Sequence, residues 1–297
     1  MSALPATTLR IALPKGRMAD GVSRLLDEAG ISLRKTARGY RPVLGLADTE
    51  VKLLKPQNVV EMLASGSRDV GFAGADWVEE LEVSAGAWSS RGVVEVLDTG
   101  LDPVRVVAAA PRELLRDGEL PRRPLVIASE YERLTTRWIA ERQLEARFVR
   151  SFGATEVFPP EDADCIVDNT ATGATLAANG LEIVDELLRS STRLYASRAA
   201  WSDPDRRGRI EDLALLLRSV IDARKRVMVE VNVSAAGLDE LVAVLPCMRE
   251  PTIARLLGDG FAVKVAVPRD ALATLIPTIR ARGGTDIVVS PISQLVP

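Results

Sequence analysis

The sequence predicts an α/β protein with a two-lobed body and a smaller C-terminal module, on three observations. Short apolar strands alternate with helical patterns in the first half, a second alternation follows the strand-like residues 104–110, and the order of elements changes near Arg226. At 297 residues the chain is long enough for two or three domains. We expect lobe I over residues 1–105 and 193–224, lobe II over 106–192 and the module over 225–297.

Lobe I begins with three strands separated by helices. The strands are predicted at residues 9–13, 51–55 and 69–74, and the segments between them carry apolar residues at helical spacing. This βαβαβ order is typical of an open sheet with helices on its faces. Ligands of such sheets bind beyond the carboxyl ends of the strands, so we expect the site in the loops there.

Lobe II has its own alternation, after which the chain returns to lobe I. Two lobes connected in this way predict a cleft between them. Beyond 104–110 we predict strands at 125–128, 147–150, 165–167, 181–184 and 193–196, helices at 131–144 and 209–224, and surface loops at 112–124 and 202–209.

The module after residue 225 has a different order of elements. Strands at 227–233, 261–267 and 287–290, a short strand or turn at 252–257, and helices at 238–245 and 270–282 give the order βαββαβ. This order is that of a ferredoxin-like fold. The module contains no catalytic constellation, so we expect it to bind a ligand or to regulate.

Composition excludes several classes of protein. The chain has no histidine, which rules out a Ser-His-Asp triad, a Cys-His pair and an HExxH zinc site, and it lacks the P-loop and GxGxxG patterns. A net charge of −3 argues against nucleic-acid binding, and no apolar run of about 18 residues predicts a membrane span. The start lacks a secretory pattern, and Cys165 and Cys247 lie among apolar neighbours, so we expect free thiols in a cytoplasmic protein.

The segment from Asp168 to Thr175 is the strongest candidate for a ligand site. Asp168 ends a buried strand, where its carboxylate can accept hydrogen bonds from ribose hydroxyls. The glycine that follows lets the backbone approach a ligand, and successive amides with threonine hydroxyls suit the oxygens of a phosphate. An ordinary turn of small residues between a strand and a helix has the same pattern. The candidates are Asp168, Thr170, Thr172, Gly173, Ala174 and Thr175.

Charged residues at other strand ends are further candidates. Lys15 and Arg17 lie between a strand and a helix, where the helix dipole adds to their charge, and arginine can bind pyrophosphate bidentately. Lys55 ends the next strand and is a weaker candidate. Asp76 suits capping of the helix after residue 74, and Glu156 is a lone carboxylate near the loop. Lys15 and Arg17 could instead form a solvated basic turn. Asp76 could serve only to cap its helix, and Glu156 could be simply a solvated carboxylate.

Together these candidates indicate phosphoribosyl transfer. A ribose 5-phosphate held by its phosphate and hydroxyls, with a cationic pocket for a departing pyrophosphate, is the layout that this reaction needs. The transition state resembles an oxocarbenium ion, so positioning and charge stabilisation can supply most of the rate. Mg²⁺ would neutralise the pyrophosphate, and no histidine is required.

Four segments resemble the long form of the ATP phosphoribosyltransferase family: LPKGR, GSRDVGFAGADW, ADCIVDNTATGATLAANGLEIVDE and REPTIARL. The resemblance runs through nearly the whole chain, and D-x-x-x-T-G-x-T after a buried strand is its most specific part. It implies a bilobal catalytic domain like type II periplasmic binding proteins and a ferredoxin-like domain that binds the feedback inhibitor histidine. It also implies that the protein forms hexamers and can exist as dimers.

The implied reaction joins N1 of the adenine of ATP to C1 of phosphoribosyl pyrophosphate (PRPP) with inversion, the first step of histidine biosynthesis. By the same resemblance, Asp168 binds the ribose hydroxyls, Thr172 to Thr175 bind the 5-phosphate, and Glu156 lies at the ribose. Lys15, Arg17 and Lys55 fall at the pyrophosphate and triphosphate, and Tyr131 falls where an aromatic residue meets the nucleotide. The implied histidine contacts are Asn232, Met248, Glu250 and Thr252.

Several residues depart from the family pattern. The spacing from Glu156 to Asp168 is one residue shorter than usual, and the remaining departures are Asn58, Glu161, Asn169 and Glu250. The sequence has three alternative interpretations. A prephenate dehydratase-like enzyme needs a Thr-Arg-Asp-Thr-type loop, which the chain lacks. A solute-binding or sensor protein is expected to carry a signal peptide or a DNA-binding domain, and a catalytically dead relative is expected to lose the phosphate loop.

Overall fold

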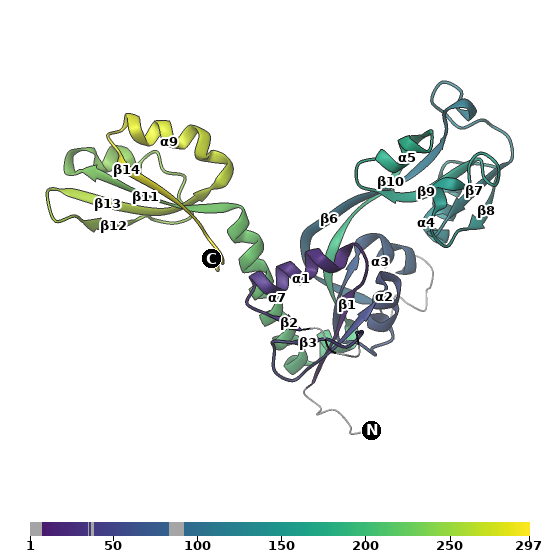
Figure 1. Cartoon of the computed structure of the whole chain (residues 1–297), viewed down its shortest axis with the longest axis horizontal. Helices are drawn as coiled ribbons and strands as arrows, with labels where there is room; N and C mark the ends of the chain where they lie inside the picture. The colour runs from purple at the N-terminus through teal and green to yellow at the C-terminus, as the bar shows by residue number, and fades with distance from the viewer. Residues whose placement is uncertain (1–7, 35, 37–38, 83–91) are drawn as a thin grey trace. The chain divides into compact units, whose positions relative to one another are not determined.

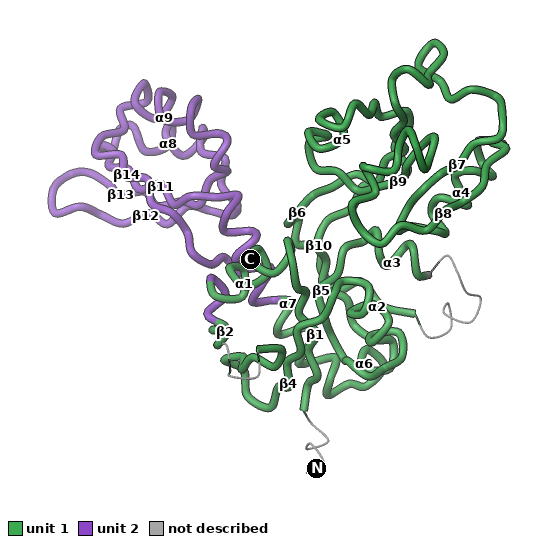
Figure 2. The backbone as a smooth tube through the Cα atoms, turned by 45° about the vertical axis from the view of Figure 1, so that its right-hand side comes forward, with its two compact units in different colours: residues 1–27, 31–214 green, residues 28–30, 215–297 purple. Residues whose placement is uncertain are grey.

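A computed structural model describes residues 8–34, 36, 39–82 and 92–297 of the chain. The chain divides into two compact units, residues 1–27 with 31–214 and residues 28–30 with 215–297 (Figure 2). In the part of the chain that the structure describes, no helix is long and apolar enough to cross a membrane.

Unit 1 is built on one eight-stranded mixed sheet in the order β4-β1-β5-β10-β6-β9-β7-β8. The first three strands of that order are parallel, as are β9, β7 and β8, while β10 and β6 run antiparallel to their neighbours. Figure 1 shows β6 and β10 as two long ribbons that join the two groups, so the expected two-lobed α/β fold is confirmed. The strands are β1 (Leu9–Pro14), β4 (Thr49–Leu54), β5 (Val70–Gly74), β6 (Val93–Pro111), β7 (Leu125–Ser129), β8 (Ala146–Arg150), β9 (Cys165–Thr170) and β10 (Leu181–Ser197), with a short pair β2 (Leu33–Arg34) and β3 (Val43–Leu44) beside them.

The long strand β10 replaces two shorter strands predicted at 181–184 and 193–196. Its middle carries polar residues that break the apolar pattern, yet it pairs with β6 from Leu181 to Ser197 with several register shifts. Ser190 and Thr192 are buried there. Pairing with β6 therefore overrides the local preference of this stretch for a loop.

Helices cover the sheet of unit 1, and their starts follow the chemistry of their first residues. The predicted loop at 202–209 is wrong, because α7 already begins at Pro204. Asp203 accepts hydrogen bonds from the amides of Asp205 and Arg206, and proline suits the first position of a helix. The helices are α1 (Met18–Glu28), α2 (Pro56–Ala64), α3 (Ala75–Glu82), α4 (Glu132–Glu141), α5 (Ala174–Ala178), α6 (Arg198–Ser202) and α7 (Pro204–Arg224), which continues into unit 2.

Unit 2 has the predicted ferredoxin-like fold, an antiparallel sheet in the order β12-β13-β11-β14. Four valines of β11, from Val227 to Val233 at every second position, are almost fully buried in its core. Burial of each stabilises the fold by about 1.5–3 kcal/mol relative to an exposed side chain. The elements are β11 (Arg226–Ser234), α8 (Leu238–Val242), β12 (Thr252–Arg255), β13 (Gly260–Pro268), α9 (Leu272–Ala281) and β14 (Thr285–Pro291).

Both cysteines are free thiols, as expected from their apolar neighbours. Cys165 lies in β9 with no exposed surface. Burial raises the pKa of its thiol to about 12, so it is an inert core residue.

Candidate functional site

One cavity of unit 1, which we call the cleft, brings together residues from distant parts of the chain. It has a volume of about 400 Å³ and lies at the carboxyl ends of β1 and β5, beside the middle of β10 and the end of β9. Ligands of open α/β sheets bind at such strand ends. Its lining includes the predicted Lys15, Arg17 and Asp76 together with Trp77, Asp102, Asn169 and Ser190, which were not predicted as site residues.

The cationic edge of the cleft is the turn after β1. Lys15 is half-buried and places its ammonium 3.6 Å from the centre of the Tyr40 ring, a cation–π contact that no sequence pattern indicated. Arg17 is exposed, and Gly16 between them has φ 73°, which favours glycine. Lys55 precedes α2 and is also exposed, and its neighbour Pro56 lines the cleft.

Asp76 is the buried carboxylate of the cleft. It is the second residue of α3, so it lies inside the helix and not at the position before it. Its Oδ2 accepts a hydrogen bond from the Tyr131 hydroxyl at 2.6 Å, and its Oδ1 accepts one from Ser190 Oγ at 2.7 Å. A Cβ at Gly74 would collide with Asp76 Oδ1, so glycine at the end of β5 leaves the space that this carboxylate fills.

Tyr131 is buried behind Asp76. Its ring stacks on Trp77 with a centroid distance of 4.7 Å, and it has no exposed surface. Burial, and then the charge of Asp76, raise the pKa of its phenol well above the ordinary value, so the hydroxyl stays a donor. With its ring covered, Tyr131 offers no face to a nucleotide in this structure, and its hydroxyl instead holds Asp76.

Asp168 lies near the end of β9 among other carboxylates. Burial raises its pKa to about 6, with added repulsion from Glu156 and Glu130, while hydrogen bonds from the Asn169 amide and Thr155 act in the opposite direction. Glu156 belongs to the short 3-10 helix Thr155–Val157, and its charge acts on Asp168. Glu130 was not predicted, and nothing in its local sequence marks it.

The loop after Asp168 is folded by its own threonines. Thr170 Oγ1 accepts the Gly173 amide at 2.9 Å, and Thr172 Oγ1 accepts the Ala174 amide at 3.3 Å. Gly173 has φ 82° and precedes α5, so the amides of Thr175 and Leu176 fall in the first helical turn, where no earlier helical carbonyl can accept them. Thr172, Ala174 and Thr175 are exposed. The turn thus combines amides that lack an earlier helical acceptor with exposed threonines, and both kinds of donor suit a phosphate.

This loop and the cleft adjoin at the end of β9. Asn169 follows Asp168 directly and lines the cleft, whereas Thr172 to Thr175 do not line it. The site therefore has two neighbouring parts, an anion-ready turn and a cleft with cations on one edge and a buried carboxylate at its base.

Two of the four predicted histidine contacts share one face of the unit 2 sheet. Thr252 pairs with Lys264 and Asn232 pairs with Ala262, two residues along β13, so both side chains point to the face away from the helices. Asn232 donates to Asp286 at 3.1 Å. Met248 and Glu250 lie in the connection that leads into β12.

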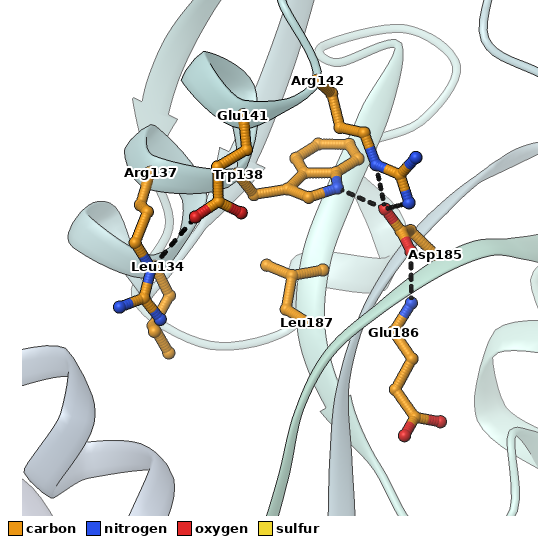
Figure 3. Close-up of a pocket in the computed structure, with 8 residues that line it drawn as sticks. All are labelled: Leu134, Arg137, Trp138, Glu141, Arg142, Asp185, Glu186 and Leu187. Atoms are coloured by element: carbon orange, nitrogen blue, oxygen red, sulfur yellow. Dashed lines mark hydrogen bonds and ion pairs between the residues drawn. The ribbon is translucent and has the colours of Figure 1, made fainter.

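A second cavity of unit 1, of about 470 Å³, lies between α4 and β10 and contains none of the predicted residues (Figure 3). Asp185 accepts hydrogen bonds there from Trp138 Nε1 at 2.7 Å and Arg142 Nε at 2.6 Å. Arg137 pairs with Glu79 outside the cavity. Its charged groups are thus engaged with protein partners, and the arrangement does not suggest a ligand site.

No group of three or more carboxylates, cysteines or histidines suited to a metal ion occurs among the residues that the structure describes. A divalent cation in the cleft would thus need oxygen ligands from a bound substrate, as is usual for Mg²⁺ with phosphates.

Comparisons with known proteins agree along the chain. The family model described as ATP phosphoribosyltransferase matches residues 55–219, and the model for the HisG C-terminal domain matches residues 223–294. An ATP phosphoribosyltransferase of Pelotomaculum thermopropionicum is 34% identical over 97% of this chain and 99% of its own length. One from Chlorobaculum parvum is 34% identical over 97% of each chain. A solved ATP phosphoribosyltransferase (HisG:HisZ) complex from Thermotoga maritima has a chain that is 25% identical with a TM-score of 0.62, covering 72% of this chain and 99% of that chain.

Proposed function

The chain belongs to the ATP phosphoribosyltransferase family, and we propose that the β9 loop binds PRPP while the adjoining cleft receives ATP. The enzyme transfers the phosphoribosyl group of PRPP to N1 of ATP and releases pyrophosphate, the first step of histidine biosynthesis. Membership of this family argues against the two alternative functions, a prephenate dehydratase-like enzyme and a solute-binding or sensor protein.

The observation that carries the assignment of the PRPP half is the geometry of residues 168–175. Asp168 offers a carboxylate near the end of a buried strand, and within a few residues the turn that follows begins a helix whose first amides have no earlier helical carbonyl to accept them. A ribose 5-phosphate needs both groups at this spacing, hydroxyl acceptors at one end and anion donors at the other. Glu130 and Glu156 beside Asp168 add negative charge where positive charge develops on the ribose ring.

The cleft supports the other half of the reaction. N1 of the adenine attacks C1 of the ribose, the bond from C1 to the pyrophosphate oxygen breaks, and the electron pair leaves with pyrophosphate. Lys15 and Arg17 lie where cations can stabilise that departing charge, and Lys55 can reach a triphosphate from the start of α2. The reaction is therefore driven by positioning and charge.

Members of this family use a metal ion in catalysis, and we assign that ion as Mg²⁺ bound to PRPP. The described residues supply no metal cage of their own, which fits a cation that arrives on substrate phosphates. When bound, Mg²⁺ would neutralise the pyrophosphate, and Asp102 is a cleft carboxylate that could add to its ligands.

The test mixes purified protein with ATP, PRPP and Mg²⁺ and follows pyrophosphate release and phosphoribosyl-ATP formation. Thr175→Ala is expected to weaken PRPP binding about tenfold without changing the melting temperature, because it removes a phosphate ligand from an exposed turn. Thr274→Ala, an exposed threonine of α9 in unit 2, is the matched control. Wild-type PRPP affinity in Thr175→Ala would exclude this turn as the 5-phosphate site.

We further propose that unit 2 binds histidine as a feedback inhibitor on the sheet face of Asn232 and Thr252, with Met248 and Glu250 completing the contacts. Histidine should inhibit the wild type and act about tenfold more weakly on Thr252→Ala, with catalysis in its absence unchanged. Indifference of the wild type to millimolar histidine excludes this regulation and leaves the catalytic assignment intact.

Self-association into dimers or hexamers is part of the same proposal. The edge strand β12 is exposed along its whole length, with Ile253 and the adjoining Leu257 uncovered. Exposed edges of this kind are usually paired or covered in an assembly. Light scattering of the purified protein should give a mass of two or six chains, and a monomer at micromolar concentration contradicts it.

A further inference from the structure

A chain of hydrogen bonds links β9 to the carboxylate at the base of the cleft. Asn169 Nδ2 donates to the Tyr131 hydroxyl at 2.9 Å, and that hydroxyl donates to Asp76 Oδ2 at 2.6 Å. Ser190 holds the other carboxylate oxygen and also accepts the Asp76 amide at 3.0 Å. This series of hydrogen bonds thus joins segments that are far apart in sequence. It runs from Asn169 to Asp76, and both of these residues line the cleft.

The direction of the hydrogen bonds restricts the residue at position 169. Tyr131 has one hydroxyl proton, and it goes to Asp76, so its oxygen can only accept from its other neighbour. A side chain without a donor, such as leucine, would leave the buried phenol oxygen without this partner. The Asn169 amide supplies the required N–H group.

Tyr131 is also fixed to β9 at its backbone. Its amide donates to Ser129 Oγ at 2.9 Å, and Ser129 Oγ donates to the Val167 carbonyl at 2.6 Å. Val167 and Asn169 flank Asp168 in β9. The tyrosine is therefore held at both ends by the residues on either side of the proposed ribose ligand.

We propose that Asn169 is a positioning residue that aligns Asp76 in the ATP half of the site with Asp168 in the PRPP half, through the phenol of Tyr131. This inference rests on the proposed division of the site between β9 and the cleft. Asn169 and Tyr131 therefore affect kcat/KM for ATP and make no contact with the 5-phosphate of PRPP.

Another contact keeps the same helices together without Asn169. Glu80 of α3 is buried and accepts the backbone amides of Arg133 and Leu134 at the start of α4, at 3.1 and 3.0 Å. We therefore expect the fold to survive loss of the Asn169 hydrogen bond, so that its effect on Asp76 can be measured.

The experiment is a double-mutant cycle with Asn169→Leu, Tyr131→Phe and both together, assayed with ATP and PRPP. Each single variant should lower kcat/KM for ATP about five- to tenfold and leave the Kd for PRPP within about twofold. The double variant should lose no more than the worse single variant, because both substitutions break the same chain. Asn58→Leu, which removes an exposed asparagine of α2 that bonds only to Glu61 among the described residues, is the matched control and should match the wild type.

Losses that multiply in the double variant, to about 25- to 100-fold, would show that Asn169 and Tyr131 act independently and overturn the proposal. An unchanged kcat/KM in either single variant, or a PRPP Kd that weakens as much as kcat/KM falls, also overturns it. If Asn169→Leu does not fold by circular dichroism, Asn169→Ser, whose hydroxyl is too short to replace the amide, takes its place in the cycle. Absence of phosphoribosyl transfer in the wild type, measured alongside, contradicts the proposed function instead.

Discussion

The β9 loop and the cleft are two halves of one site that are constructed in different ways. The loop consists of eight consecutive residues, from Asp168 to Thr175, and its turn is held by its own threonine hydroxyls. The cleft is assembled from Lys15, Asp76 and Ser190, which meet only because β1, β5 and β10 are neighbours in the sheet. Local substitutions should therefore affect the loop through its chemistry and the cleft through its packing.

The largest expected effect is at Asp168, where function and stability oppose each other. Asp168→Asn should weaken PRPP binding about 100-fold, because a neutral amide replaces a charged acceptor of two ribose hydroxyls. The same variant should be more stable at pH 7 by about 1–3 kcal/mol, since the fold raises the pKa of Asp168 from 3.8 to about 6 and so disfavours its charged form. Calorimetric PRPP titration and urea unfolding measure the two effects.

The sign of this stability effect can be checked against pH. A raised carboxyl pKa means that the folded state binds more protons than the unfolded state between about pH 4 and 6, so stability falls as pH rises through that window. Asp168→Asn should lack this contribution, and Asp162→Asn, at an exposed aspartate nearby, should keep it. Equal stability of Asp168→Asn and the wild type at both pH 4 and pH 7 contradicts the account.

Gly74→Ala tests the packing of the cleft. The added methyl group would collide with Asp76 Oδ1 and must displace the carboxylate from Ser190. We expect a loss of about 1–3 kcal/mol in the free energy of unfolding and at least a tenfold fall in kcat/KM for ATP. Gly208→Ala, at a position in α7 where a Cβ meets nothing within 4 Å, should instead stabilise the protein by about 0.5–1 kcal/mol. Wild-type activity of Gly74→Ala would show that Asp76 has no role in the site.

The smallest expected effect is at Tyr40, which holds Lys15 at the cationic edge. Tyr40→Ala should lower kcat about two- to fivefold, the value of an exposed cation–π contact, because Lys15 lies where it can stabilise the departing pyrophosphate, and it should leave 5-phosphate binding by the loop unchanged. Tyr40→Phe keeps the ring and should behave as the wild type in the same steady-state assay. If Tyr40→Phe and Tyr40→Ala give the same fall in kcat, the face of the Tyr40 ring does not orient Lys15.

The contrast between the halves also explains how far the sequence could be interpreted. The β9 loop was predictable because a buried strand, an aspartate and a glycine turn follow one another within a short segment. The ferredoxin-like module was predictable because its apolar residues alternate regularly, as Val227 to Val233 do. The start of α7 differs from the loop that the sequence predicts, because Asp203 and Pro204 are typical of a turn, whereas in the structure Asp203 accepts the first amides of the helix.

The residues missed lie where distance in sequence conceals proximity. Ser190 and Asn169 contribute through partners 114 and 38 positions away, and Glu130 influences Asp168 only through space. The burial of Tyr131 depends on the stacking of Trp77 from another helix, which no periodicity encodes. Such pairings arise from the strand order of the sheet and not from any local pattern.

The central claim, that Asp168 on β9 binds the ribose of PRPP, is tested most directly by the pH dependence of PRPP binding. Because the pKa of Asp168 is about 6, wild-type affinity should fall as pH decreases through 6, when the carboxylate takes up a proton. The phosphates of PRPP also titrate in this range, and Asp168→Asn isolates their contribution. We predict calorimetric affinities that differ about 100-fold between wild type and variant at pH 7.5 and converge toward pH 5. Parallel curves separated by no more than about twofold would contradict the claim.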